Sequence, residues 1–279
     1  MKPAAFAYAR PSSLAEALQL LAPGDAGAKA LAGGQSLGPM LNLRLVDVRL
    51  LVDLTGIREL VGVEETADAV TLGACISHAD IEDGRVPDPT GGALAAVAGG
   101  IAYRAVRNRG TIGGSLCHAD PAADWVSVLA CLGAEAAIAS KAGRRMLPVE
   151  RFVVGAFEQA LEPGELLAAV RVPRLSERAR WGYCKFCRKP GEFPEALAAV
   201  LADPARGLVR VVIGAMGRAP ILVPDASALF ERKSGQATLG RLDSGSADRL
   251  LAELGIADPI ERQIRGTALK RAAAAAGAA

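Results

Sequence analysis

The chain has 279 residues, of which 51% are hydrophobic and only 4% aromatic, and its formal net charge at neutral pH is +2. This length suits one large domain or two to three small lobes with aliphatic cores. No run of like charge supports nucleic acid as a partner, and no apolar run reaches the roughly 20 residues that direct membrane insertion needs. Five cysteines without disulfide-like spacing indicate a reducing compartment, so we expect a cytoplasmic protein.

Hydrophobic periodicity, glycines and prolines divide the chain into many short elements. Strands are predicted at 29–32, 50–53, 60–63, 69–73, 135–139, 144–147, 166–172, 181–186, 197–201 and 208–215. Helices are predicted at 13–21, 40–45, 78–82, 91–106, 121–132, 225–230, 247–254 and from 259 onward. Ser13 and Ser77 are the expected helix caps, and the alanine-rich tail at 272–279 should fray. The pattern indicates an α+β protein with three lobes, at 1–57, 58–175 and 176–279.

The first candidate binding segment follows the strand predicted at 29–32 and contains two adjacent glycines. Its residues are Ala32, Gly33, Gly34, Gln35 and Ser36. Glycine permits positive φ and a close approach of the backbone to a ligand, and successive exposed N–H groups form an anion-binding concavity. An ordinary turn between two elements has the same composition, so this segment alone leaves both interpretations open.

A second segment with the same features lies 80 residues further along, counted from Gly33 to Gly113. It consists of Thr111, Ile112, Gly113, Gly114 and Ser115. We expect the same backbone donors here, with a positive helix end from Pro121 beside them. Two converging donor loops suit a diphosphate. The Rossmann fingerprint and the P-loop motif are both absent, so we interpret the ligand as a flavin dinucleotide held by another fold.

Three polar side chains follow the second segment: His118, Asp120 and Asp124. A metal site is disfavoured, because His78 is the one other histidine and the sequence has no compact ligand set. We expect Asp120 to cap the next helix and Asp124 to hydrogen-bond hydroxyl groups of a sugar or ribityl chain.

Cys184 and Cys187 form a lone C-x-x-C pattern inside a predicted strand. Residues three apart in a strand point to opposite faces, so we expect these thiols to pack rather than to bind metal or an iron–sulfur cluster.

Aromatic and basic residues gather where the third lobe is predicted to begin. Tyr183 can stack on a flat ring, and Lys185, on the same strand face, can lie near a ring that becomes anionic on reduction; an exposed basic strand end is the alternative. Arg104, Arg107 and Arg109 form either a solvated helix end or a phosphate or partner contact. No nucleophile or histidine-based triad occurs, so we assign no catalytic residue. A cofactor that carries the chemistry, as in electron transfer, fits this.

Three segments resemble the FAD-binding medium subunits of molybdenum hydroxylases, including that of aerobic carbon monoxide dehydrogenase. They are AGGQSL at 32–37, TIGGSL.HADPAAD at 111–124 and Y.KF.RKPGEF at 183–193. The opening F.Y.RP.SL.EAL.LL and PGELL..V.VP at 163–173 agree as well, so the resemblance covers most of the chain. Three features depart from the family pattern. Gln35 stands where many members have histidine, Pro194 where alanine is common, and the helix at 261–271 is only loosely similar.

The resemblance implies a PCMH-type fold, similar to that of vanillyl-alcohol oxidase, with FAD between the first two lobes and the C-terminal lobe approaching the flavin. It implies that both glycine segments hold the diphosphate region and that Asp124 contacts the polar chain of the flavin. Leu167, Tyr183 and Lys185 match positions near the isoalloxazine ring.

The resemblance also implies partners. A large subunit carries molybdopterin with its molybdenum, and a small subunit carries two [2Fe-2S] clusters, from which electrons reach FAD and then an external acceptor. A stand-alone flavin oxidoreductase of the same fold is one alternative, although no third lobe rich in acid–base residues supports it. A non-catalytic nucleotide-binding or assembly subunit is another.

Overall fold

The computed structural model describes residues 2–22, 27–231 and 239–277. Contacts within the chain group it into two compact units. Unit 1 comprises Met1–Ala119 and Ala134–Arg174, and unit 2 comprises Asp120–Gly133 and Leu175–Ala279. Each unit combines helices with sheets, so the predicted α+β class is confirmed. The division into three lobes, at 1–57, 58–175 and 176–279, stays a prediction.

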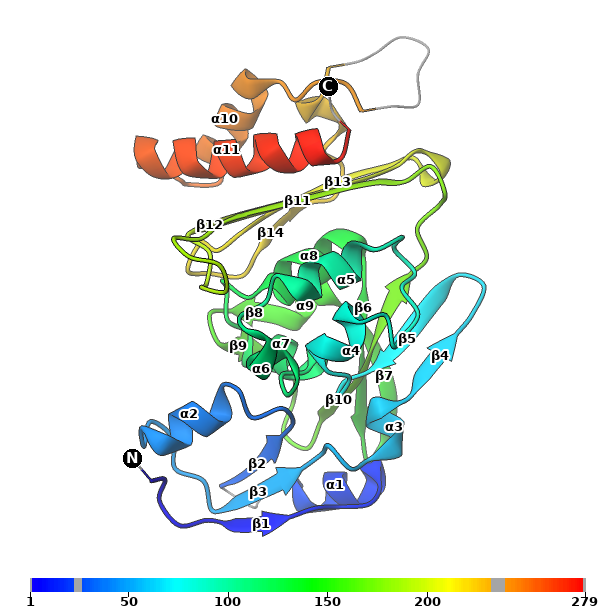
Figure 1. Cartoon of the computed structure of the whole chain (residues 1–279), viewed down its shortest axis with the longest axis vertical. Coiled ribbons are helices and arrows are strands. Elements are labelled where there is room, and N and C mark those ends of the chain that lie inside the picture. The colour runs from blue at the N-terminus through cyan, green and yellow to red at the C-terminus, as the bar shows by residue number, and fades with distance from the viewer. Residues whose placement is uncertain (1, 23–26, 232–238, 278–279) are drawn as a thin grey trace. The chain divides into compact units, whose positions relative to one another are not determined.

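Unit 1 contains a small parallel sheet and a larger antiparallel one (Figure 1). The parallel sheet has the order β1–β3–β2, from β1 (Ala7–Ala9), β2 (Ala28–Leu31) and β3 (Leu50–Asp53). The antiparallel sheet, in spatial order, consists of β4 (Val63–Glu65), β5 (Ala69–Gly73), β10 (Leu166–Pro173), β6 (Glu135–Ser140) and β7 (Gly143–Pro148). A separate ladder pairs β8 (Val153–Gly155) with β9 (Glu158–Gln159).

Serine caps begin two helices of unit 1, as predicted. The Ser13 hydroxyl accepts the Glu16 N–H at the start of α1 (Leu14–Leu20). Ser77 and Asp80 exchange the two hydrogen bonds of a capping box at the start of α4 (His78–Glu82). The remaining helices are α2 (Leu37–Asn42), α3 (Arg58–Val61), α5 (Ala93–Gly99), α6 (Arg104–Arg107), α7 (Ile112–His118) and α9 (Val149–Phe152). A core cluster joins α1 to strands of both sheets, so unit 1 is held together by shared apolar burial.

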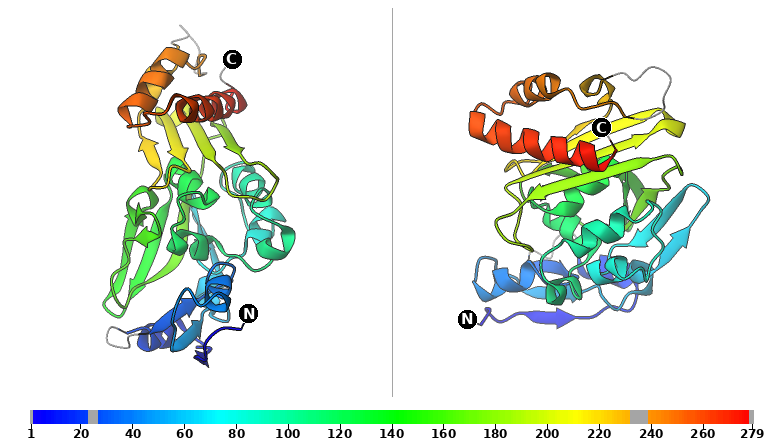
Figure 2. Two further views of the ribbon diagram at one scale, coloured as in Figure 1. Left: turned by 90° about the vertical axis from the view of Figure 1, so that its left-hand side faces the viewer. Right: turned by 45° about the horizontal axis from the view of Figure 1, so that its top comes forward.

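Unit 2 is built on a four-stranded antiparallel sheet with helices on both faces (Figures 1 and 2). Its strands, in spatial order, are β11 (Arg180–Phe186), β12 (Ala196–Asp203), β13 (Leu208–Gly214) and β14 (Ile221–Val223). α8 (Asp124–Leu132) packs against β12 and β13, while α11 (Pro259–Ala275) covers β11 and β12 and α10 (Ser244–Glu253) packs on α11. Every residue of β12 is buried, which explains its continuous apolar sequence.

Residues 272–275 belong to α11 and Ala276 is its C-cap, so the prediction that this segment frays is wrong for residues 272–276. Residues 278–279 lie outside the described residues. Ala272, Ala273 and Ala276 are buried. The reason is a close approach to β11, because a Cβ at Gly182 would lie 1.8 Å from the Ala272 carbonyl oxygen. Small residues on both elements therefore bring helix and sheet together.

Two predicted elements differ from the structure in type. Residues 60–63 form the end of α3 and the start of β4 rather than one strand. Ile57 and Leu60 are both fully buried at a helical spacing, whereas Val61 is 45% exposed, and this periodicity overrides the apolar run. The segment 111–115, predicted as a loop, is the cap and first turn of α7.

Four predicted helices differ in extent. The helix predicted at 40–45 is α2, which lies three residues earlier. The helix predicted at 91–106 divides into α5 and α6, with Ala102 at positive φ between them. The helix predicted from Pro121 begins at Asp124. The segment at 225–230 contains only a 3₁₀ turn, Ser227–Leu229.

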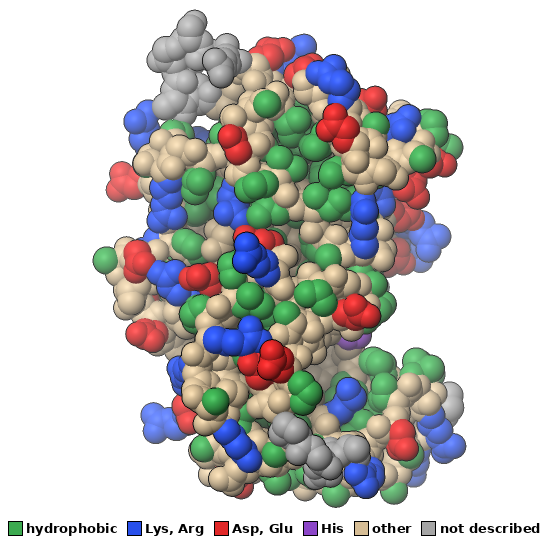
Figure 3. All heavy atoms as spheres, turned by 180° about the vertical axis from the view of Figure 1, so that it is seen from behind, with side chains coloured by type: hydrophobic (Ala, Val, Ile, Leu, Met, Phe, Trp, Pro, Cys, Tyr) green, Lys and Arg blue, Asp and Glu red, His purple; other side chains and the backbone are tan. Residues whose placement is uncertain are grey.

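In the part of the chain that the structure describes, no helix has both the length and the apolar character needed to cross a bilayer. On the face drawn in Figure 3, basic and acidic side chains lie interspersed, in keeping with the small net charge.

The packing of α11 predicts different costs for two alanine substitutions in the same segment. Ala272→Arg forces a charged side chain into the contact with β11, which we expect to cost about 3 kcal/mol or more of unfolding free energy. Ala274→Arg, at an exposed position, should change it by less than about 0.5 kcal/mol. Urea unfolding followed by circular dichroism measures both changes. Equally small changes for the two variants would contradict the packing of this segment and support the prediction that it frays.

Burial of His78, at the start of α4, predicts a pH dependence of stability. The side chain is 5% exposed, and burial, aided by the positive charge of Arg107, lowers its pKa from 6.5 to about 4. The unfolded chain therefore takes up this proton at higher pH than the folded chain. The stability from neutral His78 is complete above pH 6.5 and is lost as the pH falls toward 4, by about 3 kcal/mol.

Unfolding free energies at neutral pH and near pH 4, compared between the wild type and His78→Gln, isolate this contribution. The wild type should lose more stability on acidification than the variant, and identical losses would rule it out.

Candidate cofactor-binding site

The first glycine segment is the turn between β2 and α2. Gly34 has φ +71°, so the positive φ expected of this glycine pair is found at its second member. Gly33 is buried against another backbone, because a Cβ there would lie 2.0 Å from the carbonyl oxygen of Arg109. The Gln35 side-chain amide donates to the Gly33 carbonyl at 3.1 Å and so closes the turn. Only glycine fits at Gly33.

The second glycine segment uses its glycines differently. Thr111 caps α7, and its hydroxyl accepts the Gly114 N–H at 3.0 Å. Gly113 lies in the helix and packs on Ala74, whose Cβ would be 2.5 Å from a Cβ at this position. The N–H groups of Ile112, Gly113 and Ser115 donate to the carbonyls of Ile76, Ala74 and Thr111. The expectation of free N–H donors is therefore wrong for residues 112–115, because Thr111 and the loop carbonyls of Ala74 and Ile76 already accept their hydrogen bonds.

The two segments lie against each other within unit 1. Gly33 touches the backbone of Arg109 and Gly110, directly before the second segment, and a Cβ at Gly114 would lie 3.7 Å from the Cβ of Ala32. The pairing expected from the sequence is thus present in the fold, although it is made by backbone packing.

Unpaired donors are found in the first segment. Within the described residues, the N–H groups of Gly34, Gln35, Ser36 and Leu37 have no acceptor. Ser36 and Ser115 are partly exposed, so their hydroxyls add two further donors close to this turn. Consecutive N–H groups without acceptors suit the oxygens of a phosphate or diphosphate. The donor chemistry of this part of unit 1 therefore fits the anionic region of FAD.

A second cluster, in unit 2, joins Asp124, Tyr183 and Lys185. Asp124 is the first residue of α8, and it accepts hydrogen bonds from the Tyr183 hydroxyl and, at 2.7 Å, from the Lys185 ammonium. Tyr183 and Lys185 lie on one face of β11, as their spacing predicted. The Asp124 and Lys185 side chains are only 8% and 16% exposed. The cluster is therefore a largely buried charge pair with a tyrosine donor.

Burial is the main reason that the pKa of Tyr183 is raised well above its usual value, and the negative charge of Asp124 raises it further. Tyr183 therefore remains a hydroxyl donor at any physiological pH. Asp120, expected to cap α8, instead accepts the Ala122 N–H at 2.9 Å and closes a turn. The residue before α8 is Ala123, which makes no side-chain cap, so the capping prediction for Asp120 is wrong.

Leu167 and the two cysteines of the C-x-x-C pattern belong to neither of these clusters. Leu167, on β10 of unit 1, is 3% exposed and packs inside the protein. Cys184 packs against the core of unit 2, and the Cys187 thiol lies 3.3 Å from the Glu192 carbonyl oxygen. Neither forms a disulfide. The described residues contain no cluster of metal-binding side chains.

Sequence reasoning missed several residues around the glycine junction. Gly110, beside the second segment, contacts Gly33 and the ring of His78, and Ala74 receives Gly113. A cavity of about 360 Å³ in unit 1 is lined by Thr111, Arg109 and Ser77, among others. Gly110 could have been found from the sequence, since it directly precedes the second glycine segment. Ala74 and His78 could not, because only the folded chain brings them to the glycine junction.

Comparison with known proteins also indicates an FAD-binding chain. Residues 4–175 match the family described as FAD binding domain in molybdopterin dehydrogenase. The caffeine dehydrogenase subunit beta of Pseudomonas sp. strain CBB1 is 36% identical over 225 residues, which cover 79% of this chain and 76% of that protein. The carbon monoxide dehydrogenase medium chain of Hydrogenophaga pseudoflava is 36% identical over 201 residues, which cover 72% of this chain and 70% of that one.

A solved structure extends the likeness to the whole fold. It is the carbon monoxide dehydrogenase from Hydrogenophaga pseudoflava that lacks the Mo-pyranopterin moiety of the molybdenum cofactor, with a TM-score of 0.87, 31% identity and 99% of both chains covered. The chain therefore belongs to the family of FAD-binding medium subunits of molybdenum hydroxylases, oxidoreductase flavoproteins that include the carbon monoxide dehydrogenase medium chain.

Proposed function

We propose that this chain carries FAD as the electron-transfer subunit of a heteromeric molybdenum hydroxylase. The proposed partners are a large subunit with the molybdenum–pterin site and a small subunit with two [2Fe-2S] clusters, and an external acceptor takes the electrons. The observation that carries the proposal is the junction of two glycine segments beside the N–H groups of residues 34–37, for which the described residues supply no acceptor. Bound FAD supplies a redox centre that exchanges one or two electrons, which suits a link between one-electron clusters and an acceptor.

In unit 1, the first glycine segment, Ala32–Ser36, is the proposed diphosphate holder. Its N–H groups from Gly34 onward supply the donors, and Gly33 fixes the turn against Arg109. The second segment contributes through the Ser115 hydroxyl and by packing, because the N–H groups of its residues 112–115 are already paired. Leu167, buried on β10, is the proposed apolar residue near the isoalloxazine ring.

In unit 2, Asp124 is the proposed acceptor for hydroxyl groups of the polar chain of FAD, since a carboxylate accepts more hydrogen bonds than Tyr183 and Lys185 supply. Lys185 places a positive charge at this cluster, which favours a ring that gains negative charge on reduction. Tyr183 holds the Asp124 carboxylate in place and presents an aromatic side chain beside it.

Purification of the full chain with whatever binds it tests the proposed function directly. We expect equimolar FAD by absorbance, together with a molybdenum-containing large subunit and an iron–sulfur small subunit by metal analysis and mass spectrometry. Folded protein that contains no flavin and takes up none would contradict the assignment.

The contact at Gly33 predicts a specific loss of FAD binding. Gly33→Ala places a methyl group where the Arg109 carbonyl oxygen lies, so the turn must shift, and we expect FAD to bind at least tenfold more weakly, about 1.4 kcal/mol. Gly62→Ala in the same unit is the matched control, because Gly62 is exposed with negative φ and its nearest neighbour would be 3.4 Å away. Fluorescence titration measures both affinities, and equal affinities would remove Gly33 from the site.

The buried cluster of unit 2 predicts coupling between Asp124 and Lys185. Asp124→Asn leaves a buried ammonium without its counter-charge, so we expect about 3 kcal/mol of lost stability and weaker FAD retention. The double variant Asp124→Asn with Lys185→Met should recover much of the stability without recovering FAD. Urea unfolding and flavin absorbance report the two effects; additive stability losses would show that the residues do not interact.

A further inference from the structure

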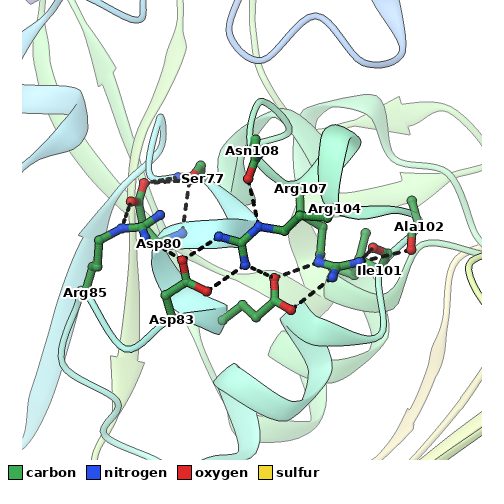
Figure 4. A network of polar contacts seen from close by, with 10 residues as sticks. Ser77, Asp80, Asp83, Arg85, Ile101, Ala102, Arg104, Arg107 and Asn108 are labelled. Carbon is green, nitrogen blue, oxygen red and sulfur yellow. Dashed lines mark hydrogen bonds and ion pairs between the residues drawn. The ribbon is translucent and has the colours of Figure 1, made fainter.

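Arg107, at the end of α6, joins α4 to the turn that precedes α6 (Figure 4). Its guanidinium donates to both carboxylate oxygens of Glu82, at 2.7 and 3.0 Å. It also donates to the carbonyl oxygens of Ile101 and Ala102, at 2.9 and 3.1 Å. The Arg107 side chain is only 12% exposed. A planar fork that contacts four acceptors fixes geometry more strictly than an ammonium group would.

The turn held by Arg107 has an uncommon backbone conformation. Ala102 has φ +43°, which a residue with a side chain adopts at a cost. The two carbonyls that Arg107 binds belong to this turn, so the side chain stabilises a conformation that the local sequence does not favour.

Backbone hydrogen bonds connect Gly110 to α6 and to the start of α4. The Gly110 N–H donates to the Val106 carbonyl at 2.7 Å, and the Gly110 carbonyl accepts the His78 N–H at 2.9 Å. The His78 ring packs on the Gly110 Cα, since a Cβ there would lie 2.9 Å from the ring. Glu82 and His78, one turn apart on α4, therefore both brace the segment that ends at Gly110.

The end of this segment, Arg109 and Gly110, is the backbone that Gly33 contacts. A displacement of Arg109 or Gly110 toward Gly33 would press on the turn, because the two backbones already lie too close to admit a methyl group. Movement there must shift the turn that presents the unpaired N–H groups of Gly34–Leu37.

We propose that Arg107, held by Glu82, is a positioning residue for the FAD diphosphate, acting through Gly110 on the first glycine segment. The inference rests on the proposed function, because it assigns FAD to that segment.

Arg104 provides an internal contrast on the same short helix. It pairs with Glu82 and Asp83, and its guanidinium also donates to Asn108 at 2.9 Å, but its side chain is 47% exposed. Among the described residues, these partners all lie outside the turn at Ile101 and Ala102. An exposed pair of this kind contributes little to stability.

The test compares Arg107→Gln, Arg107→Lys and Arg104→Gln in the full chain. Each variant is stripped of FAD, shown to be folded by circular dichroism, and titrated with FAD at a temperature well below its unfolding transition. We expect FAD to bind at least tenfold more weakly to Arg107→Gln, with a smaller loss for Arg107→Lys, which retains the charge but not the fork. Arg104→Gln should stay within about threefold of the wild type.

The outcomes separate positioning from mere stability. A purely structural role lowers the unfolding temperature of Arg107→Gln but leaves the FAD affinity of the folded protein unchanged, and that result overturns the inference. An equal loss of affinity in Arg104→Gln overturns it as well. Should Arg107→Gln not fold, Glu82→Gln takes its place, with the same expected direction. A wild-type chain that takes up no FAD refutes the proposed function itself, whereas unchanged variants refute only the role of Arg107.

Discussion

The close approach of the Gly33 turn to the backbone of Arg109 and Gly110 is the contact on which the candidate site depends. Two chain segments that are far apart in sequence meet there without any side chain between them. The contact fixes the turn that exposes four N–H groups, and it sets that turn beside the cap of α7. Because no other residue type fits, the geometry does not rely on side-chain packing that thermal motion or repacking could alter.

The four glycines of the two segments serve different physical needs. Gly34 supplies a positive φ, whereas Gly33 and Gly113 allow two backbones or a helix and a strand end to approach closely. Gly114 lies where the Thr111 hydroxyl accepts its N–H. The N–H groups of residues 112–115 thus find acceptors inside unit 1, whereas those of residues 34–37 have none in the part of the chain that the structure describes. A bound anion would therefore accept hydrogen bonds from backbone N–H groups of the first segment, together with the hydroxyls of Ser36 and Ser115.

In unit 2, the two faces of strand β11 carry different kinds of side chain. Along β11, Tyr183 and Lys185 face Asp124, while Gly182 and Cys184 face α11 and the apolar core. One face therefore holds a buried charge pair, which needs partners to offset the loss of hydration. The other face is small and apolar, and it admits the alanines of α11. A shift of one residue in the register of β11 would exchange these faces and disrupt both at once.

The sequence by itself determined the α+β class, the serine caps of α1 and α4, the pairing of the two glycine motifs and the common face of Tyr183 and Lys185. These follow from local spacing, capping chemistry and strand alternation, which need no knowledge of distant contacts. Tertiary structure alone decided that residues 58–61 form a helix, that the tail at 272–276 packs on Gly182, and that the amides of α7 are already paired. It also decided that Arg107 braces the turn at Ala102. In the first three cases the burial and most hydrogen-bond partners come from segments tens of residues away, and no local pattern records them. Arg107 contacts a nearby turn, but its guanidinium is held by Glu82, 25 residues earlier in the chain.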